Sequence, residues 1–428
     1  MAWCATLTAC SSSSDIDEDT PLDEPHATVS MLPTQEPIQL TNEQRMFANN
    51  NNLFTLQFLN KANQTDRSGK SFVYSPLSIT YVLGMVNDAA EGTTREQLEN
   101  VLGFTSGGIE AVNNYCKKLI EGLPKVDNTV QLDIANAIFV NKEYTLMPQF
   151  QQHMHNFYAA KAESYDFASP ATLGIINDWC NEKSHGMIPT ILDDINPNMM
   201  SYLLNAIYFK ANWASKFDEK YTRNETFTTP DGETQLPMMH QKVLILYAQN
   251  DIYSAVQIPY GNGNWTMTIL LPHEEKTIGD VVSSLLAEKN SSTTQSIPAF
   301  AMPRTYEVDL KLPRFETKSD TDALPGKLDG VLRQMGITEA FDPDFANIPN
   351  MCDRDVYINM IRQKAAIKVN EEGSEAAAVT VVGMMTTSMS APVVPPKATF
   401  HANRPFVYTI SESSSGVLLF VGRFTGKE

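Results

Sequence analysis

The chain has 428 residues, 42% of them hydrophobic, and a formal net charge of −18 at pH 7. This length allows two average domains or one large mixed α/β domain. The acidic balance argues against nucleic acid as a partner, because counterion release needs clustered Lys and Arg. No run of about 18 apolar residues is present, so we expect no membrane-spanning helix. The five cysteines lack CxxC spacing, so we expect neither a zinc knuckle nor a disulfide framework.

Residues 1–37 differ in composition from the rest of the chain. Leu7-Thr8-Ala9-Cys10 resembles a bacterial lipobox, and the serines and acidic run after it resemble the tether that follows a lipidated cysteine. The apolar segment before Cys10 is short and lacks a basic start, so a chance match is the alternative. A genuine lipobox makes Cys10 the lipidated residue and the lipid the only membrane contact. It also predicts an extracellular or bacterial cell-envelope location, with residues 15–37 as a disordered spacer.

Residues 38–428 are expected to form one continuous domain. Three helix starts precede the first strands, each marked by a capping residue with a partner three positions on or by Pro in the first turn. They are Thr41 with Gln44, Ser75-Pro76, and Thr93 with Glu96.

The period then changes to short runs rich in β-branched and aromatic residues. We expect strands at Leu132–Val140, Ser201–Phe209, Ala255–Pro259, Trp265–Leu271, Glu307–Leu312, Tyr357–Val369 and Val417–Phe424, with a turn at Pro259–Asn264. Helices first and strands afterwards, without regular alternation, favour an α+β fold with large antiparallel sheets.

Motifs that would indicate an enzyme are missing. The sequence contains no GxSxG elbow, no GxxxxGK[ST] phosphate loop and no GxGxxG turn. His273-Glu274-Glu275 resembles half of a zinc-helix motif, but Thr277 occupies the position of the second ligand. We therefore expect no enzyme, no metal and no cofactor, with a hydrolase as the weakest alternative.

Residues 371–399 are unusual on physical grounds. Ala376–Val382 has little bulk and suits a crowded sheet centre, yet it continues into Gly383–Ala391 and the Pro-rich Pro392–Pro396, which favour an exposed, extended loop. A loop of this length in a compact domain is usually functional or disordered. A plain mobile surface loop is the alternative interpretation.

The start of this segment, Glu371-Glu372-Gly373-Ser374-Glu375-Ala376-Ala377-Ala378-Val379-Thr380, resembles the hinge of the serpin reactive-centre loop. The resemblance covers the chain from about Asn42 onward. Four further segments resemble serpin signatures in the same order: Tyr74–Ile79, Leu204–Lys210 with Trp213, Asn403–Phe406 and Leu419–Arg423.

The resemblance implies a serpin fold of three β-sheets and about nine helices, with an exposed reactive-centre loop near the C-terminus. It implies a monomeric suicide inhibitor whose partners are target proteases. The protease cleaves the loop, is held as a covalent acyl complex, and the loop then inserts as a new strand into the central sheet. The alternative is a non-inhibitory serpin that acts as a binding or surface protein.

Alternation along a strand shows why insertion is feasible. Ser374, Ala376, Ala378, Thr380 and Val382 would share the inward face, and all are small or β-branched. The charged Glu375 falls on the other face, which avoids burying an unpaired ion. Gly373 adds conformational freedom at the hinge.

Two further groups follow from the resemblance. Ser75, Ser78, Asn205 and Gln363 match the serpin shutter, whose hydrogen bonds hold the central strands together. Gln363 replaces the usual His, but Gln can still donate and accept, without pH sensitivity. Trp213 matches the breach, where the loop first enters the sheet; Ser75 as a simple helix cap and Trp213 as plain core are the alternatives.

Counting from the hinge places the scissile bond at Thr387–Ser388, with Met385–Thr386 as a rival; counting back from Asn403 places it near Val394. The loop contains no Lys, Arg, Phe, Tyr or Trp. Trypsin-like and strictly aromatic-preferring enzymes therefore find no suitable side chain. Elastase-like or subtilisin-like serine proteases are the expected targets, with papain-like cysteine proteases as a further class.

Overall fold

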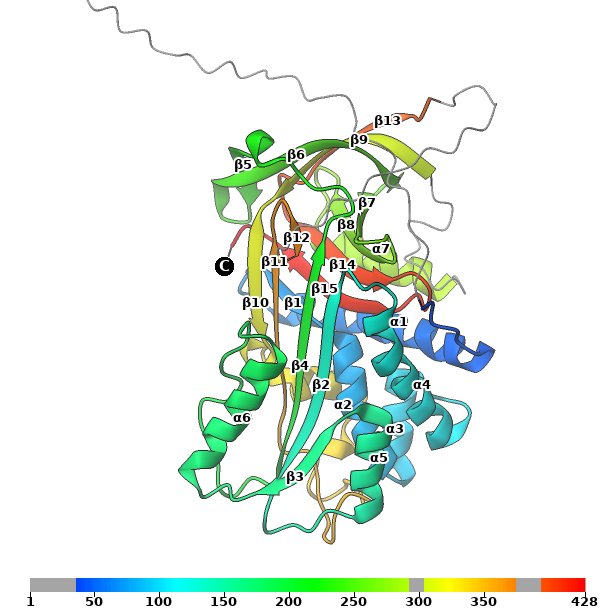
Figure 1. Cartoon of the computed structure of the whole chain (residues 1–428), viewed down its shortest axis with the longest axis vertical. Coiled ribbons are helices and arrows are strands. Elements are labelled where there is room, and N and C mark those ends of the chain that lie inside the picture. The colour runs from blue at the N-terminus through cyan, green and yellow to red at the C-terminus, as the bar shows by residue number, and fades with distance from the viewer. Residues whose placement is uncertain (1–35, 292–303, 375–393, 428) are drawn as a thin grey trace, which may run out of the picture.

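The computed structural model describes residues 36–291, 304–374 and 394–427 (Figure 1). These residues contain eight α-helices: α1 (Asn42–Thr65), α2 (Pro76–Ala89), α3 (Gly92–Leu102), α4 (Gly108–Gly122), α5 (Pro148–Tyr158), α6 (Pro170–Lys183), α7 (Ile278–Ser291) and α8 (Lys327–Met335). Single-turn 3₁₀ helices occur at Leu123–Lys125, Glu219–Tyr221, Thr321–Ala323 and Glu339–Phe341. None of the described helices is both long enough and apolar enough to span a bilayer.

A six-stranded sheet has the strand order β10-β11-β12-β4-β2-β3. Its strands are β10 (Phe315–Asp320), β11 (Ile361–Val369), β12 (Gly373–Ser374), β4 (Ser201–Asn212), β2 (Gln131–Asn141) and β3 (Lys161–Tyr165). In Figure 1, β4 and β2 run side by side along the long axis, with the short β12 at the upper end between β11 and β4.

A second sheet of nine strands has the order β1-β15-β14-β8-β7-β6-β9-β13, with β5 also pairing with β6. Its strands are β1 (Phe72–Tyr74), β5 (Arg223–Thr229), β6 (Gly232–Gln249), β7 (Tyr253–Tyr260), β8 (Trp265–Pro272), β9 (Arg304–Pro313), β13 (Lys397–His401), β14 (Phe406–Glu412) and β15 (Leu418–Phe424). Three sheets were expected, but continuous hydrogen bonding joins two of them into this one nine-stranded sheet. The reason is that β6 is continuous over 18 residues and pairs with β5 at its start and β7 at its end.

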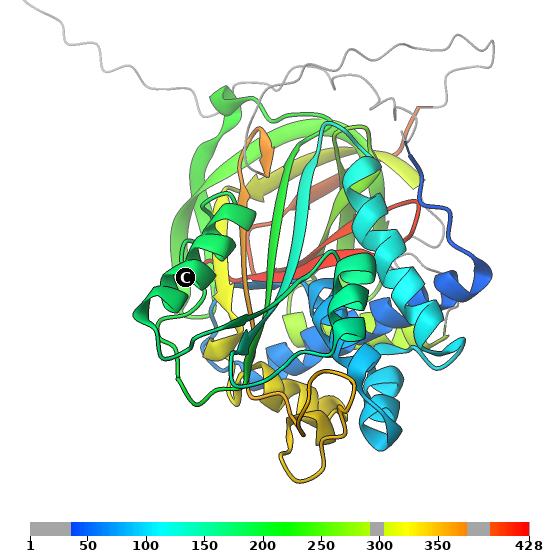
Figure 2. The ribbon, with the colours of Figure 1, turned by 60° about the horizontal axis from the view of Figure 1, so that its bottom comes forward.

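The two sheets pack face to face, and aromatic side chains fill the space between them. Figure 2 shows the six-stranded sheet in front of β14 and β15. The ring of Phe209 on β4 lies 5.6 Å from that of Tyr260, 5.4 Å from Trp265 and 6.3 Å from Phe420, measured between centroids. Such edge-to-face contacts add to the free energy gained by burying apolar area.

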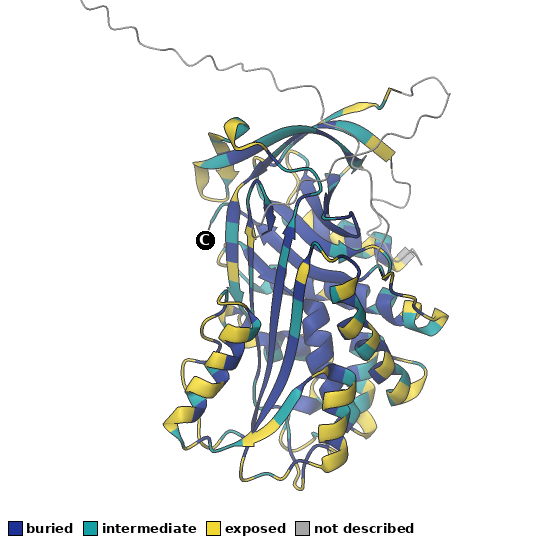
Figure 3. Ribbon diagram, viewed as in Figure 1, coloured by how far each residue is buried: buried dark blue, intermediate teal, exposed yellow. Residues whose placement is uncertain are grey.

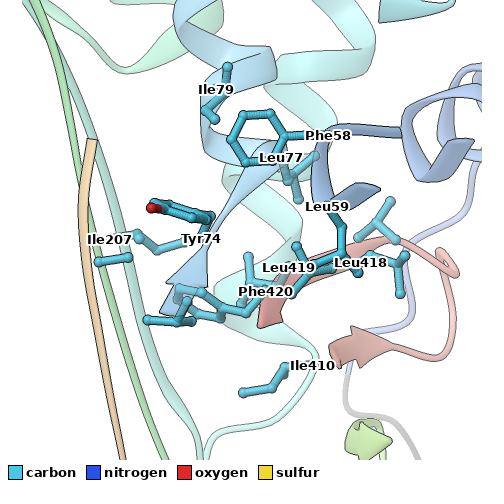
Figure 4. Close-up of a cluster of buried hydrophobic side chains, with 14 of the residues drawn as sticks. Phe58, Leu59, Tyr74, Leu77, Ile79, Ile207, Ile410, Leu418, Leu419 and Phe420 are labelled. Carbon is cyan, nitrogen blue, oxygen red and sulfur yellow. The ribbon is translucent and has the colours of Figure 1, made fainter. Parts of the chain in front are cut away.

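The helices α1 and α2 close the core on the other side of the strands β1 and β15. Figure 4 shows Phe58 of α1 and Leu77 of α2 close to Leu419 of β15, with Ile207 of β4 reaching the same cluster. All four side chains are buried. Figure 3 shows exposed residues along the outward faces of α5 and α6, as expected for amphipathic surface helices.

Two of the three predicted helix starts are confirmed. The Thr41 hydroxyl accepts from the Gln44 N–H and the Gln44 side chain accepts from the Thr41 N–H, which is the expected capping box. Ser75 caps α2 by accepting from the N–H of Ser78, with Pro76 in the first turn.

The predicted start of the third helix at Thr93 is wrong. Helix α3 begins at Gly92, and its N-cap Glu91 makes no side-chain capping bond. Contacts with a distant segment fix this start instead, because the Thr94 hydroxyl donates to Glu339 and accepts from the N–H of Asn347. Tertiary contacts therefore override the local capping signal.

The predicted strands are found within a few residues of their expected bounds, with one larger difference at β11. This strand begins at Ile361 rather than Tyr357, because the N–H of Ile358 bonds to the carbonyl of Ala340 and not to a neighbouring strand. The three described cysteines, Cys116, Cys180 and Cys352, are free and buried. No disulfide occurs among the described residues.

Candidate functional site

The central feature of the six-stranded sheet is an opening between β11 and β4. At one end the two strands pair directly and in parallel, Ile361–Gln363 with Leu203–Asn205. At the other end β12 lies between them, with Ser374 paired to both Val369 and Ala211. The strands are therefore neighbours at one end and one strand apart at the other. Within the described residues no backbone pairing joins Lys364–Lys368 to β4.

Backbone hydrogen bonds hold the entry of this opening. The N–H of Trp213 donates to the carbonyl of Glu372 at 2.8 Å, and that of Phe217 donates to Glu371 at 3.0 Å. Asn370 and Gly373 exchange two backbone bonds in a tight turn. Of the first four residues of the predicted hinge, Gly373 and Ser374 thus lie in the sheet as β12, and Glu371 and Glu372 lie in the bend before it.

Gly373 is required at this turn for two physical reasons. Its φ of +146° is a conformation that L side chains rarely adopt. A Cβ added there would lie 2.1 Å from the carbonyl oxygen of Ala211 and 2.6 Å from the Cα of Asn212. Both contacts are with backbone, which cannot move aside cheaply.

Ser374 is the first hinge residue on the inward face. Its side chain is buried, and its Oγ lies 2.8 Å from the hydroxyl of Tyr260 on the opposite sheet. The Tyr260 ring stacks on Trp213 with centroids 4.3 Å apart and an interplanar angle of 10°. The Trp213 indole N–H donates to the carbonyl of Asn370 at 2.8 Å. Trp213 therefore lies at the entry of the opening.

Two acidic residues anchor the chain just before the turn. Glu371 is 2% exposed and accepts hydrogen bonds from Arg314 at 2.6 and 3.1 Å and from the Thr222 hydroxyl at 2.6 Å. Burial alone would raise the pKa of Glu371, but the bonds from Arg314 and Thr222 outweigh it and lower the pKa. Glu372 pairs with Lys216.

The residues predicted as the shutter lie where β11 and β4 still pair directly. The Gln363 amide exchanges two 2.9 Å hydrogen bonds with the backbone of Ser75, one to its N–H and one to its carbonyl. The Ser75 hydroxyl donates to Ser78 at 3.0 Å. The N–H of Gln363 bonds to the hydroxyl of Thr321. Gln363 therefore ties β11 to the start of α2 with both halves of its amide.

Asn205 is only partly in this group. Its backbone is paired with that of Gln363, but its side chain donates to Asn136 at 2.8 Å and to the carbonyl of Ala135 at 3.3 Å. The amide thus reinforces the pairing of β4 with β2 rather than that of β4 with β11. Asn136 in turn donates to the carbonyl of Tyr158.

Several predicted site residues lie outside the described residues. They are Cys10, the rest of the hinge (Glu375–Thr380), the expected scissile bond Thr387–Ser388 and its rival Met385–Thr386. The two ends of the predicted 371–399 segment are described and lie in strands: Gly373–Ser374 forms β12, and β13 begins at Lys397.

The partners of the hinge were not predicted from the sequence. Tyr260 was assigned only to a turn, and Arg314, Thr222 and Asn370 were not singled out. Ser374 and Tyr260 are 114 positions apart, and Arg314 and Glu371 are 57 apart. No short motif can relate positions so far apart in the chain.

Comparison with known proteins agrees with this geometry. A family model described as Serpin (serine protease inhibitor) matches residues 49–426. An uncharacterized serpin-like protein of Thermococcus kodakarensis is 34% identical over 82% of this chain and 79% of its own. Human Serpin B3 is 33% identical over 82% of this chain and 92% of its own. Mouse neuroserpin is 29% identical, over 84% and 87% respectively.

Solved structures show the same fold. The thermophilic serpin Tengpin in its native state superimposes with a TM-score of 0.77 at 24% identity, over 92% of this chain and 97% of its own. Native protease nexin-1 with heparin superimposes with a TM-score of 0.73 at 27% identity, over 90% of this chain and 100% of its own. Thyroxine-binding globulin in complex with thyroxine superimposes with a TM-score of 0.74 at 24% identity, over 89% of this chain and 99% of its own.

Proposed function

The chain belongs to the serpin family, and we propose that it is an inhibitory member that traps proteases by cleavage of its loop and insertion of the loop between β11 and β4. Serpins are generally protease inhibitors rather than enzymes. One observation carries the proposal: Gly373–Ser374 already lies between the two strands, at the open end of the sheet.

The register of β12 predicts where the following residues would pair. In an antiparallel pair, each step forward along the inserting strand moves the partner residue one position back along the neighbouring strand. Since Ser374 pairs with Ala211, Ala376 would lie beside Phe209, Ala378 beside Ile207 and Thr380 beside Asn205. The same count on β11 gives Ile367, Ala365 and Gln363 as the other neighbours.

These neighbours explain the small side chains of the hinge. Phe209, Ile207, Ile367 and Ala365 are all buried, so a strand entering between them favours small inward side chains. Glu375 would fall on the opposite face, between Lys210 and Lys368. Cross-strand pairs of opposite charge each contribute about 0.2–1 kcal/mol, so the one charge of the inserting segment is favourably placed.

Insertion of Thr380 and the residues after it must separate the direct pairing of β11 with β4. That pairing ends at Gln363, which is bound to Ser75 through both halves of its amide. We infer that this contact holds the sheet closed until the loop is cut, since each bond to a buried amide resists separation by about 1 kcal/mol.

The proposed cleavage site is Thr387–Ser388, with Met385–Thr386 as the alternative. About fourteen inserted residues at roughly 3.3 Å each would carry a tethered protease on the order of 45 Å. The apolar and small loop residues support elastase-like or subtilisin-like serine proteases as targets, and papain-like cysteine proteases as a further class.

The same proposal places the protein outside the cell or at a bacterial cell envelope, as a monomer held by a lipid on Cys10. Mass spectrometry of protein expressed with residues 1–37 present tests the lipidation of Cys10 directly. A lipid adduct at Cys10, absent from Cys10→Ser, is expected, and an unmodified N-terminal peptide would contradict it.

Two arginine substitutions at adjacent hinge positions test insertion itself. Ala376→Arg places a cation between Phe209 and Ile367 and should turn the inhibitor into a substrate, which the protease cleaves and leaves. Ala377→Arg is the matched control, because position 377 falls on the outward face. It should retain trapping, slowed severalfold at most. Equal trapping by both variants contradicts insertion in this register, and no trapping by the unchanged protein would indicate a non-inhibitory serpin.

A further inference from the structure

Three metal-ligating side chains meet on the nine-stranded sheet, away from the opening. His240 lies on β6, Asp309 on β9 and His401 on β13. The Nε2 atom of His240 is 2.8 Å from Oδ1 of Asp309, and that of His401 is 3.2 Å from the same oxygen. The candidate ligand atoms of all three side chains lie within 4.8 Å of one another.

The strand register explains the cluster. His240 and His401 both pair with Lys311, from the two sides of β9. Asp309 is two residues before Lys311, so it shares the same face of the sheet. The histidines are 69 and 92 positions from Asp309, which is why no spacing motif indicated a metal site.

The donor set suits a transition-metal ion. Two imidazoles and one carboxylate form a common three-ligand set for Zn²⁺, which leaves a fourth position for water. Bonds of about 2.0–2.1 Å in a tetrahedron put neighbouring ligand atoms roughly 3.3 Å apart. The two histidine nitrogens lie 2.8 and 3.2 Å from Asp309, and all three ligand atoms lie within 4.8 Å of one another. Imidazole ligands favour Zn²⁺, Cu²⁺ or Ni²⁺ over Mg²⁺ and Ca²⁺.

The triad can be reached from solvent, and the neighbouring Lys311 does not place an unpaired positive charge beside it. The side chains of His240, Asp309 and His401 are 21%, 35% and 36% exposed, so an ion can enter from solvent. The Lys311 ammonium bonds to both oxygens of Glu225, at 2.8 and 2.9 Å. Its charge is thus neutralised locally.

We propose that His240, Asp309 and His401 bind one divalent transition-metal ion such as Zn²⁺. The ion would tie β13 to β6 and β9. Within the described sheet β13 is an edge strand that pairs only with β9, over five residues. A metal ion at His401 would therefore add a direct link from this edge strand to β6, which the hydrogen bonds of the sheet do not provide.

Metal binding by the intact, chelator-treated full chain tests this proposal without any reference to protease inhibition. Titration with Co²⁺, followed by visible absorption, and calorimetric titration with Zn²⁺ should both show one ion per chain at the triad. His240→Ala and His401→Ala should each weaken binding by about 100-fold. His273→Ala is the control, because the ring of this half-buried histidine contacts the Asn250 carbonyl at 2.7 Å and lies outside the triad.

Folding is checked in parallel by melting each variant without metal. If His240→Ala melts abnormally, His240→Gln, which keeps a polar side chain of similar length, replaces it. Zn²⁺ at about 100 times its dissociation constant should raise the melting temperature of the unchanged protein by roughly 3 °C, and not that of the triad variants. No binding up to about 1 mM, or binding that both histidine variants leave unchanged, would overturn the proposal.

Discussion

The hydroxyl of Ser374 lies 2.8 Å from that of Tyr260, which joins the inward face of the hinge to the opposite sheet. The Tyr260 ring also stacks on Trp213, whose indole bonds to the turn at Asn370. The first inward residue of the hinge is therefore already packed in the core. Insertion, on this account, extends a strand that has already begun rather than starting a new one.

Removing the Tyr260 hydroxyl should loosen the hinge. Tyr260→Phe leaves the buried Ser374 hydroxyl without this partner, which costs about 1–2 kcal/mol. Hydrogen exchange at residues 370–374 should become faster. Tyr253→Phe is the control, since that hydroxyl bonds to Glu288 on α7. Equal exchange at the hinge in the two variants would show that the contact does not anchor β12.

Gly373→Ala should expel β12 from the sheet. The added Cβ meets the backbone of Ala211 and Asn212, and the φ of +146° adds strain. We expect the free energy of unfolding, measured with urea, to fall by more than about 2 kcal/mol. Gly232→Ala separates the two causes, because Gly232 has a φ of +131° with nothing within 4 Å of its added Cβ. Gly232→Ala should reduce the free energy of unfolding by less than Gly373→Ala does. Equal reductions would mean that the steric clash at Gly373 contributes nothing.

The ion pair at Glu371 predicts an acid-sensitive hinge. Because the pKa of Glu371 is lowered from its usual 4.5 in the folded protein, its stabilising effect is complete above pH 4.5 and is lost as the pH falls through the native value. Glu371→Gln should be about 1–2 kcal/mol less stable at pH 7 and should lose less stability between pH 5 and 3. Parallel pH curves of the urea midpoint for the two proteins would contradict this role.

Gln363→His should make the shutter pH-sensitive. A neutral imidazole can replace part of the Gln363 amide contact with Ser75, but an imidazolium cannot accept from the Ser75 N–H. Burial should lower the native pKa of the new histidine below about 6.5, so its stabilising contact is complete above that pH and lost as the pH falls. The variant's melting temperature should therefore drop between pH 7 and 5 relative to the unchanged protein. An equal change in both would refute this.

Local signals in the sequence predicted the parts of the fold that depend on neighbours in the chain. The caps at Thr41 and Ser75, and the alternation that buries Ser374, follow from short-range geometry. Gly373 was predicted as a hinge for its conformational freedom, and the structure adds a steric reason at the Ala211 carbonyl.

The remaining features depend on contacts between distant segments. The side chain of Asn205 bonds to Asn136 and not to the shutter serines, which no motif could distinguish. The start of α3 is set by a segment about 250 positions away, at Asn347. The union of two expected sheets depends on the unbroken length of β6, a strand that was not predicted from the sequence.

The central claim is most directly tested by mixing the purified protein with neutrophil-type elastase and with subtilisin, followed by denaturing gels and mass spectrometry. The account predicts an SDS-stable complex with at least one of them and a released C-terminal peptide that begins at Ser388, or at Thr386 if the alternative bond is cut. Cleavage of the loop without any stable complex, against these and a wider panel of proteases, would contradict it.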